Sequence, residues 1–392
     1  MSAPSKVDMK FSDGTVVNTW LSFTLRDTYT DPLGELSFEV APNRGKMWAH
    51  AQLFKKGELV NIAINDVPQG QYVITTVSVK IGMSSVLFSI TCKTPLATAY
   101  EGGVDPDFVF HAQTDAPVTA YVLDVLSPYG YDKAVGDTAA SVNTLTGKAI
   151  GNRKPTRDVE QLKHQDAQPH DGETAYQLCA RVVTRLGLCI RQAADSDVTR
   201  GGSLLLGAPD YDQDALYTLV QTFTEPVAGA DRMLADIEVI DTNENQFAEC
   251  ILRGQAQEKK QQARTDRPAS SVTSASLNSQ RPCYQSTEMP HKPLYIKDKH
   301  SRDVLRCSST AKLAMGLRAK DAFVVSCEVP GFVSRTGALW QVDTIASVRI
   351  DALDIREDMW ILERTFKCTR EQAQVTSLKL IPKGNLVIGD AP

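Results

Sequence analysis

Strict alternation of apolar and polar residues is the feature that most limits how this 392-residue chain can fold. Leu21, Phe23 and Leu25 alternate with polar neighbours, and the pattern returns at 36–40, 60–64, 72–79 and 86–92. A period of two places successive side chains on opposite faces of a strand. Short alternating strands separated by turn signals predict an antiparallel sandwich or a small barrel over the first hundred residues.

The C-terminal part of the chain has the same texture. A helical pattern over 304–321 precedes strand-like runs at 323–329, 345–350, 359–366 and 375–381. Ile74 and Ile90 lie 90 − 74 = 16 residues apart, and Leu362 and Leu378 lie 378 − 362 = 16 residues apart. This spacing fits a duplicated barrel, but it also fits a chance match between two β-rich segments.

The middle of the chain differs in composition. Residues 102–172 are polar and rich in Gly, Asp and Pro, and 174–186 carries an apolar face at helical spacing, with Gly187 as a stop. The runs LCIRQA and SLLLGA then read as a short strand pair. We therefore expect a mixed α/β unit inserted after an all-β one. Strands resume at 237–239 and 248–252, and a Ser/Gln/Lys-rich stretch that follows predicts an extended arm or linker.

Composition excludes several classes of protein. The net charge of −5 argues against tight nucleic-acid binding, which needs clustered basic residues. The start, MSAPSKVDMK, lacks the apolar core of a signal peptide, and no run is long enough to span a membrane. None of the eight cysteines lies within three residues of another, which excludes CxxC chemistry and indicates reduced thiols in a cytoplasmically made protein.

One cluster of polar residues suits a metal ion by type. His164, Asp166 and His170 crowd together just before Asp171, and imidazole and carboxylate groups are ligands of zinc and manganese. However, their spacing does not place two histidines on one helical face, and Pro169 opposes a helix there. A solvated loop that leads into the next helix, with Asp171 near its N-cap, explains the same residues. We therefore predict no metal site, and a metal-dependent hydrolase stays a remote alternative.

No catalytic or cofactor-binding signature is present elsewhere. The loop between two strand-like runs contains Gly331, Gly337 and Trp340, but it lacks the spacing and the following helix of a phosphate-binding loop. We interpret the glycines as turn residues and Trp340 as packing against the sheet. The carboxylates at 351, 354, 357 and 358 read as a solvated turn. The sequence therefore predicts no enzyme, no catalytic residue and no cofactor.

Several stretches resemble one protein family. The runs VPGFVSRTGALWQVDTIASVRIDALDI and MWILERTFKCTREQAQVTSLKLIP are similar to the C-terminal barrel of Mu-type baseplate hub proteins of contractile-tailed phages, including G-x-LW at Gly337, Leu339 and Trp340. NQFAECILRGQ resembles the strand before that family's linker. GELVNIAINDVPQGQYVITTVSVKIGMSSVLFSITCKTPLATAYEGG resembles its first barrel and the exit from it.

The resemblance implies a T-even hub-like fold, mainly β with two similar small tail-tube-like barrels and an inserted α/β domain. The expected domains are a first barrel at 1–101, completed by about 207–255, an insertion at 102–206, an extended arm at 256–301, and a helix with a second barrel at 302–392.

The function that the resemblance implies is a structural hub in the virion tail baseplate, assembled in the host bacterial cytoplasm. Such a hub is a homotrimer with pseudo-sixfold symmetry that joins the hexameric tail tube, or a tube initiator, to the trimeric central spike. Surrounding baseplate proteins are further partners, and DNA passes through the channel without specific binding or a membrane anchor. The alternative is a hub or spike component of a phage-derived injection or type VI secretion machine. Because the chain ends at Pro392 directly after the last strand, we expect a separate spike protein.

Overall fold

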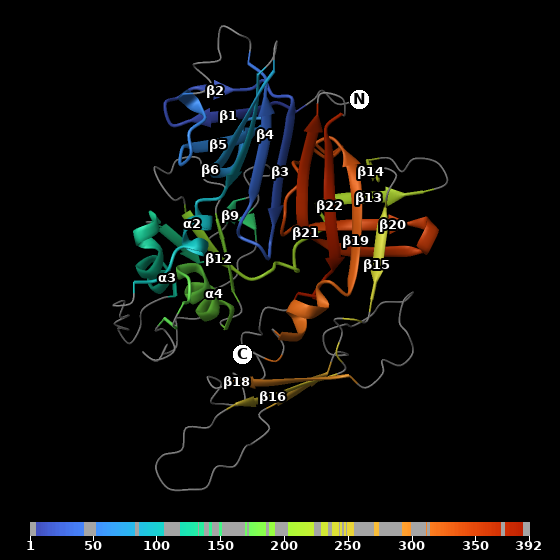
Figure 1. Cartoon of the computed structure of the whole chain (residues 1–392). Helices are drawn as coiled ribbons and strands as arrows, with labels where there is room; N and C mark the ends of the chain where they lie inside the picture. Colours follow the sequence, from blue (N-terminus) through green and yellow to red (C-terminus); the bar gives the residue numbers. More distant parts are fainter. Residues whose placement is uncertain are drawn as a thin grey trace.

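The structure is a computed structural model. It describes residues 5–42, 52–82, 86–105, 118–131, 133–136, 141–142, 149–150, 169–170, 172–185, 188–192, 203–222, 229–233, 237–242, 244, 247, 249–254, 270–273, 292–298, 311, 314–369 and 373–386. The predicted class, mainly β with an α/β insertion, is confirmed: strands dominate both ends of the chain, and helices gather mainly in the insertion (Figure 1).

The N-terminal part consists of strands, as the alternating pattern predicts. They are β1 (Val7–Phe11), β2 (Val16–Val17), β3 (Ser22–Thr28), β4 (Glu35–Val40), β5 (Leu59–Ile64), β6 (Val67–Ile81) and β7 (Val86–Lys93). Along β4, β5 and β7 buried and partly exposed residues alternate, and the buried ones join the main core. Hydrophobic burial of this single face holds the strands in register, because a slip by one residue would expose it.

The inserted unit is a small α/β fold with its own core. Its elements are α2 (Leu96–Glu101), α3 (Val118–Leu126), η2 (Ser127–Tyr129), β8 (Lys133–Gly136), β9 (Ser141–Val142), β10 (Ala149–Ile150), α4 (Ala175–Arg185), β11 (Cys189–Gln192) and β12 (Ser203–Gly207). The predicted helix and strand pair are confirmed as α4 and as antiparallel β11 and β12. A separate buried cluster, which includes Tyr121 and Leu178, packs the helices onto the strands.

The C-terminal part is again mainly β. It contains β13 (Tyr217–Gln221), β14 (Asp231–Arg232), β15 (Glu238–Asp241), β19 (Phe323–Pro330), β20 (Ile345–Ile350), η4 (Asp351–Leu353), β21 (Ile355–Thr369) and β22 (Val375–Pro382). A small third sheet holds β16 (Glu249–Gly254), β17 (Ser270–Thr273) and β18 (Pro293–Asp298). A helix over 314–319 leads into β19, and its Met315 packs with Cys250 and Leu252 of the small sheet.

The strand pairing differs from one of the expected domain limits. Residues 207–255 do not complete the first barrel, because β13 pairs with β20 and β15 pairs with β19. The pairing of β13 with β20 is parallel, so it joins parts of the chain that are far apart in the sequence. No local turn signal predicts such a pairing. Of the stretch 256–301 the structure describes 270–273 and 292–298, where β17 and β18 both pair with β16. Their backbone groups gain ladder partners even though the segment is polar.

The main sheet contains a four-strand unit twice. In the first unit the order is β6–β7–β4–β3, and in the second it is β21–β22–β19–β15. The two units have matching registers: Ile74 faces Cys92 as Ile361 faces Leu380, and Leu25 faces Leu36 as Val239 faces Val325. The duplication that the residue spacing left open is therefore present in the strand pairing.

Both long strands carry a bulge at the same place in the unit. The register shifts between Ile74 and Thr76 in β6, and between Ile361 and Glu363 in β21. Before the bulge, β6 pairs with β5 and β21 pairs with β20. After it, each strand runs on past that partner. A bulge bends its strand and increases the local twist, so it marks the point where each long strand leaves one neighbour.

The two units together supply eight neighbouring strands of a 14-stranded sheet and share a core. Strands β3 and β21 lie side by side and join the units (Figure 1). The ring of Phe332 lies 6.1 Å from that of Phe23 in the first unit and 4.8 Å from that of Phe366 in the second. All three side chains belong to the same buried cluster. Among the described residues, no helix has the length and apolar content needed to cross a membrane.

The repeat provides a test of what the joint contributes. Phe366 is fully buried at the joint, so Phe366→Ala should lower the free energy of unfolding by about 3–5 kcal/mol. Val79 holds the same position in the first unit but is 45% exposed, so Val79→Ala should cost less than about 1 kcal/mol. Urea unfolding at low protein concentration measures both. Equal losses of unfolding free energy in the two variants would mean that burial at the joint adds nothing to the contribution of Phe366.

Candidate assembly interface

The joint between the units is a seven-residue antiparallel ladder. It runs from Glu363 opposite Thr28 to Thr369 opposite Ser22, with Phe366 opposite Leu25 near its centre. These residues are more than 300 positions apart in the chain. The ladder satisfies the backbone groups of the β3 edge and of the second half of β21, groups that would otherwise invite another strand.

Charged side chains support this ladder. Arg26 donates two hydrogen bonds to Glu363, from Nε to Oε1 at 2.9 Å and from Nη2 to Oε2 at 3.0 Å. Because Arg26 is about half exposed, this forked pair fixes geometry more than it adds stability. Arg364 is buried and lies 3.4 Å from the Asp27 carboxylate. It also donates to the carbonyl of Trp340 and lies over the Phe366 ring, 4.6 Å from its centroid.

The two outer ends of the set of eight strands have only one strand partner each among the described residues. Residues 76–81 of β6 pair with β7 alone, because β5 ends opposite Val73. At the other end, β15 pairs with β19 alone. In the repeat, β21 corresponds to β6 and β3 corresponds to β15. The strand edges that pair with each other at the joint are therefore the counterparts of these two outer edges. We call these two outer ends the open edges.

The outward face of the sheet is polar across both units. Alternate residues point away from the core, and hydroxyl side chains predominate among them. The charged side chains on this face are Arg26, Lys80, Lys93, Lys367 and Lys379, with Glu35, Glu39, Glu238, Glu328 and Glu363. Five basic and five acidic groups leave the face without net charge. We call this surface the polar face.

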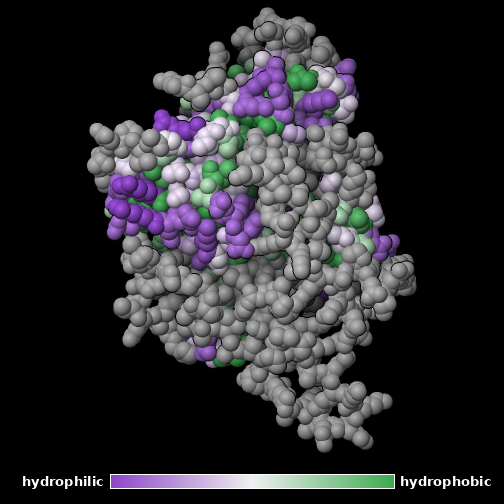
Figure 2. Space-filling view, turned by 180° about the vertical axis from the view of Figure 1, so that it is seen from behind, coloured by the Kyte–Doolittle hydropathy of each residue, from purple (hydrophilic) through white to green (hydrophobic). Residues whose placement is uncertain are grey.

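Hydrogen bonds hold several of its carboxylates in place. Glu39 accepts bonds from Ser22 Oγ at 3.1 Å and from Ser89 Oγ at 3.0 Å. Glu328 accepts a bond from Ser377 Oγ at 2.8 Å and lies 3.4 Å from Lys367 Nζ. Figure 2 shows the molecule from behind, and its coloured residues are mostly hydrophilic with smaller apolar patches between them. The polar face is thus a surface of ordered dipoles and paired charges, without a described cluster of cations.

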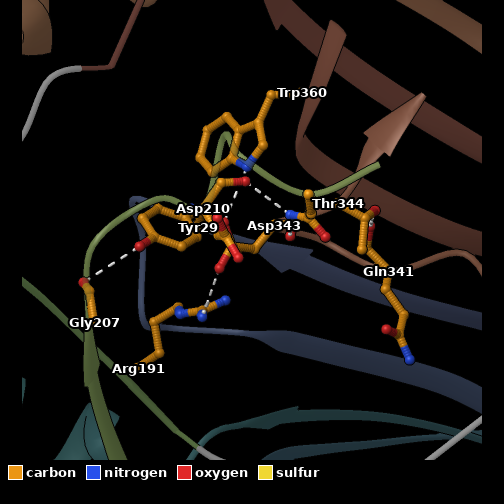
Figure 3. Close-up of polar contacts among 9 residues, drawn as sticks. Tyr29, Arg191, Gly207, Asp210, Gln341, Asp343, Thr344 and Trp360 are labelled. Atoms are coloured by element: carbon orange, nitrogen blue, oxygen red, sulfur yellow. Dashed lines mark hydrogen bonds and ion pairs between the residues drawn. The ribbon is translucent and has the colours of Figure 1, made fainter. Parts of the chain in front are cut away.

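A buried polar cluster ties the inserted unit to both repeats (Figure 3). Asp343, in the loop before β20, accepts hydrogen bonds from the Trp360 indole N–H at 3.0 Å and from the backbone N–H of Asp210 at 3.2 Å. Arg191 of β11 lies 3.0 Å from its other carboxylate oxygen. The Arg191 guanidinium stacks 4.3 Å from the ring of Tyr29. Tyr29 follows β3, so all three parts of the fold meet here.

Burial dominates the electrostatics of this cluster. It raises the pKa of the Asp343 carboxyl to about 6, and the nearby Arg191 charge and the two N–H donors oppose that rise. The Asp343 backbone has a φ of +66°, a left-handed conformation that Asp adopts more readily than most residues. The chain therefore accepts both a largely buried carboxyl and an unusual backbone at the point where its parts join.

The structure places only part of the candidate metal cluster. His164, Asp166 and Asp171 lie outside the described residues, whereas the backbone N–H of His170 donates to Glu173 at 3.0 Å. The residues that cap α4 are Thr174 and Gln177, which exchange two side chain–backbone bonds of 3.1 and 3.2 Å. This is the reciprocal capping arrangement of T-x-x-Q, which was readable in the sequence. Within the described ranges, no group of His, Cys, Asp and Glu side chains is arranged to hold a metal ion.

The loop between β19 and β20 is built as the sequence analysis interpreted it. Gly331 and Gly337 have φ values of +80° and +85°, and the Trp340 side chain is fully buried. The Trp340 ring lies 4.4 Å from that of Tyr217 in β13. At the following turn, Asp351 pairs with Arg349 at 2.7 Å and Asp358 pairs with Lys383 at 3.4 Å. Sequence reasoning missed Asp343 and Arg191, because neither belongs to a recognisable local motif.

The fold is similar to that of several solved proteins. No protein-family model and no curated protein matches the chain. Among solved structures, a tail protein from Neisseria meningitidis MC58 is similar with a TM-score of 0.71 and 16% identity, covering 99% of each chain. The 43 kDa tail protein of prophage MuSo2 from Shewanella oneidensis has a TM-score of 0.71 and 14% identity, covering 97% of this chain and 99% of that one.

A third similar structure comes from a secretion system. It is an E. coli component of the type VI secretion system, itself described as similar to the T4 tail proteins gp27 and gp5. Its TM-score is 0.55 at 9% identity, covering 98% of this chain and 79% of that chain. At these identities the likeness concerns the fold.

The buried carboxyl predicts a pH dependence of stability. Its pKa is raised in the folded state above the usual value near 4, so the folded protein binds this proton more tightly than the unfolded chain does. The stabilisation is present below about pH 4 and is lost as pH rises through about 6. Relative to Asp343→Asn, the wild type should therefore lose about 2–3 kcal/mol of unfolding free energy between pH 4 and 7.

Urea unfolding of both proteins at several pH values measures this difference. The comparison uses the change of unfolding free energy with pH in each protein. The cost of leaving Arg191 without its carboxylate partner in the variant does not change with pH, so it cancels. If the wild type instead gains stability relative to Asp343→Asn as pH rises, the ion pair outweighs burial and the assignment is wrong.

Proposed function

We propose that this chain is the structural baseplate hub of a contractile phage tail. In this role it forms a homotrimer that joins the hexameric tail tube, or a tube initiator, to the trimeric central spike, and DNA passes through its centre. It carries no catalytic role, works in the virion tail, and is assembled in the host bacterial cytoplasm. The fold that it shares with phage tail proteins supports a tail role.

The observation that carries the proposal is the four-strand unit that occurs twice in one sheet. Three chains contribute six such units, so a threefold assembly presents six similar surfaces toward a sixfold tube and three toward a threefold spike. The joint between β3 and β21 shows how neighbouring units are connected. Identical head-to-tail contacts give a closed ring when the rotation between neighbours divides a full turn.

The polar face is suited to the passage of DNA. Strong DNA binding depends on Lys and Arg side chains that displace counterions from phosphates. On this face each basic side chain is balanced by an acidic one, and Lys367 and Lys379 lie beside Glu328 and Asp321. A duplex moving along such a wall would meet hydroxyl groups and paired charges. The inserted unit at 102–206 then remains for contacts with surrounding baseplate proteins.

A component of an injection or type VI secretion machine is the second candidate. Likeness to the E. coli secretion component favours it, although the TM-score of 0.55 is lower than the 0.71 of the two tail proteins. The neighbouring genes separate the two possibilities. Tail tube, tape measure and baseplate genes support the phage role, and secretion-system genes support the other.

The trimer is tested by the mass of the purified chain. Sedimentation velocity over a range of concentrations should show a species of three times the 42.9 kDa chain mass, alone or on co-expression with the spike encoded beside it. A chain that stays monomeric under both conditions, at low and moderate salt, contradicts the proposal. Salt is varied because exposed ion pairs weaken with ionic strength.

DNA passage predicts weak binding that charge changes can reverse. The wild type should not retain a short DNA duplex in a gel-shift experiment at about 100 mM salt. Glu35→Lys combined with Glu328→Lys removes two negative charges from the polar face and adds two positive ones, so retention should appear. The control, Asp124→Lys with Asp354→Lys, makes the same charge change elsewhere. Equal retention by both double variants would show that only net charge matters.

A further inference from the structure

We propose that the open edge of β6 in one copy pairs antiparallel with the open edge of β15 in the next copy, with Val79 opposite Val239 and Lys80 opposite Glu238. This inference rests on the proposed ring and supplies its contact at the level of single residues. The contact between chains would then have the same strand pairing as the joint between β21 and β3 within each chain.

The register follows from the repeat. Within the chain, Phe366 of β21 faces Leu25 of β3. Phe366 faces Thr376 of β22 just as Val79 faces Phe88 of β7, and each lies four residues beyond its bulged residue, so Val79 is the counterpart of Phe366. Leu25 and Val239 are counterparts because both face the same position of the neighbouring strand in their units. Applying the contact within the chain to the open edges therefore sets Val79 against Val239.

Side-chain burial agrees with this assignment. At the joint, Phe366 and Leu25 are fully buried. In the single chain, Val79 is 45% exposed and Ile81 is 78% exposed, although both lie on the face of β6 that continues the core. Exposed apolar residues on an open strand edge are a liability that proteins usually cover or break with charges. A partner strand in the proposed register would place Ile81 opposite Ile237 and extend the core across the boundary between copies.

The charges on the opposite face also match. One residue beyond Val79, the register sets Lys80 against Glu238, and both side chains are exposed in the single chain. Neither makes an ion pair with another described residue. Opposite charges facing each other across two strands stabilise the pairing, and like charges destabilise it. An independent feature of the sequence thus agrees with a register derived only from backbone pairing.

A second copy is the occupant that the geometry favours. The open edges lie on the first and last of the eight strands of the two units, with the other six strands between them (Figure 1). Each chain therefore offers one edge of either kind, and the two are complementary in register, apolar face and charge. Pairing them joins copies head to tail and covers both open edges once the ring closes.

Charge exchange tests the contact without removing apolar surface. Lys80→Glu and Glu238→Lys should each raise the concentration for half-maximal assembly by about threefold or more, since like charges then face each other. The double variant restores an opposite pair and should assemble as the wild type does. Lys93→Glu is the matched control, because Lys93 lies on the same face inside the first unit and away from both open edges. Losses that add in the double variant would overturn the pairing.

Disulfide cross-linking tests the register itself. Residues directly opposite on paired strands lie within reach of a disulfide, whereas residues two positions away do not. Lys80→Cys with Glu238→Cys should give covalently linked chains on mild oxidation of the full-length protein at high concentration. Lys80→Cys with Ile240→Cys, and each single variant, should give only the background of the native cysteines.

The outcomes separate this inference from the proposed function. A trimer in which the matched cysteines do not link, or in which the shifted pair links equally well, overturns the register but leaves the hub role standing. A chain that neither assembles nor links at high concentration contradicts both. Selective linking of the matched pair together with charge rescue supports the contact.

Discussion

The pairing of β3 with β21 is the interaction on which the rest of the structure depends. It turns two curled sheets into one, merges their apolar faces into a single core, and fixes the position of the loop that carries Asp343. Removing it would leave two edges exposed and divide the aromatic cluster of Phe23, Phe332 and Phe366. Hydrophobic burial and backbone pairing act here on the same residues, so neither can be lost alone.

The length of β6 and β21 makes that pairing possible. Each has fifteen residues, while their first partners β5 and β20 have only six. The surplus extends beyond the local hairpin, and the bulge at Thr75 or Leu362 bends it away from that partner. The first half of the strand thus pairs with its hairpin partner, while the second half pairs with β7 or β22 on one side and is available to a neighbour on the other. In β21 the neighbour is β3 of the same chain.

The sequence predicted those elements whose pattern is local. Alternation at 36–40 and 60–64 became β4 and β5, and the apolar face of 174–186 became α4. The spacing of Ile74 and Ile90 suggested a repeat that is present, but it does not match the two units residue by residue, because Ile74 corresponds to Ile361 and Leu362 is the bulged residue. The parallel contact of β13 with β20 was not predictable, since its partners are far apart in sequence and carry no turn between them.

The candidate interface was predictable only in outline. An unpaired edge can be anticipated once strands are expected, but which edge stays open depends on the order of strands in the sheet. The cluster around Asp343 was missed for a related reason. Arg191, Tyr29 and Trp360 come from three distant segments, and each alone looks like an ordinary strand residue. The helix cap was the opposite case, because Thr174 and Gln177 form a local signature, T-x-x-Q, that can be recognised in the sequence.

Because one chain carries both units, fewer contacts of the proposed ring have to form between separate molecules. A ring made of six separate units needs every contact to form by collision, and its yield then depends steeply on protein concentration. Here every second contact is made within the chain, where tethering gives an effective concentration that can reach the millimolar range. It therefore forms regardless of how scarce the protein is. Only three contacts between chains then remain to be made in the proposed ring.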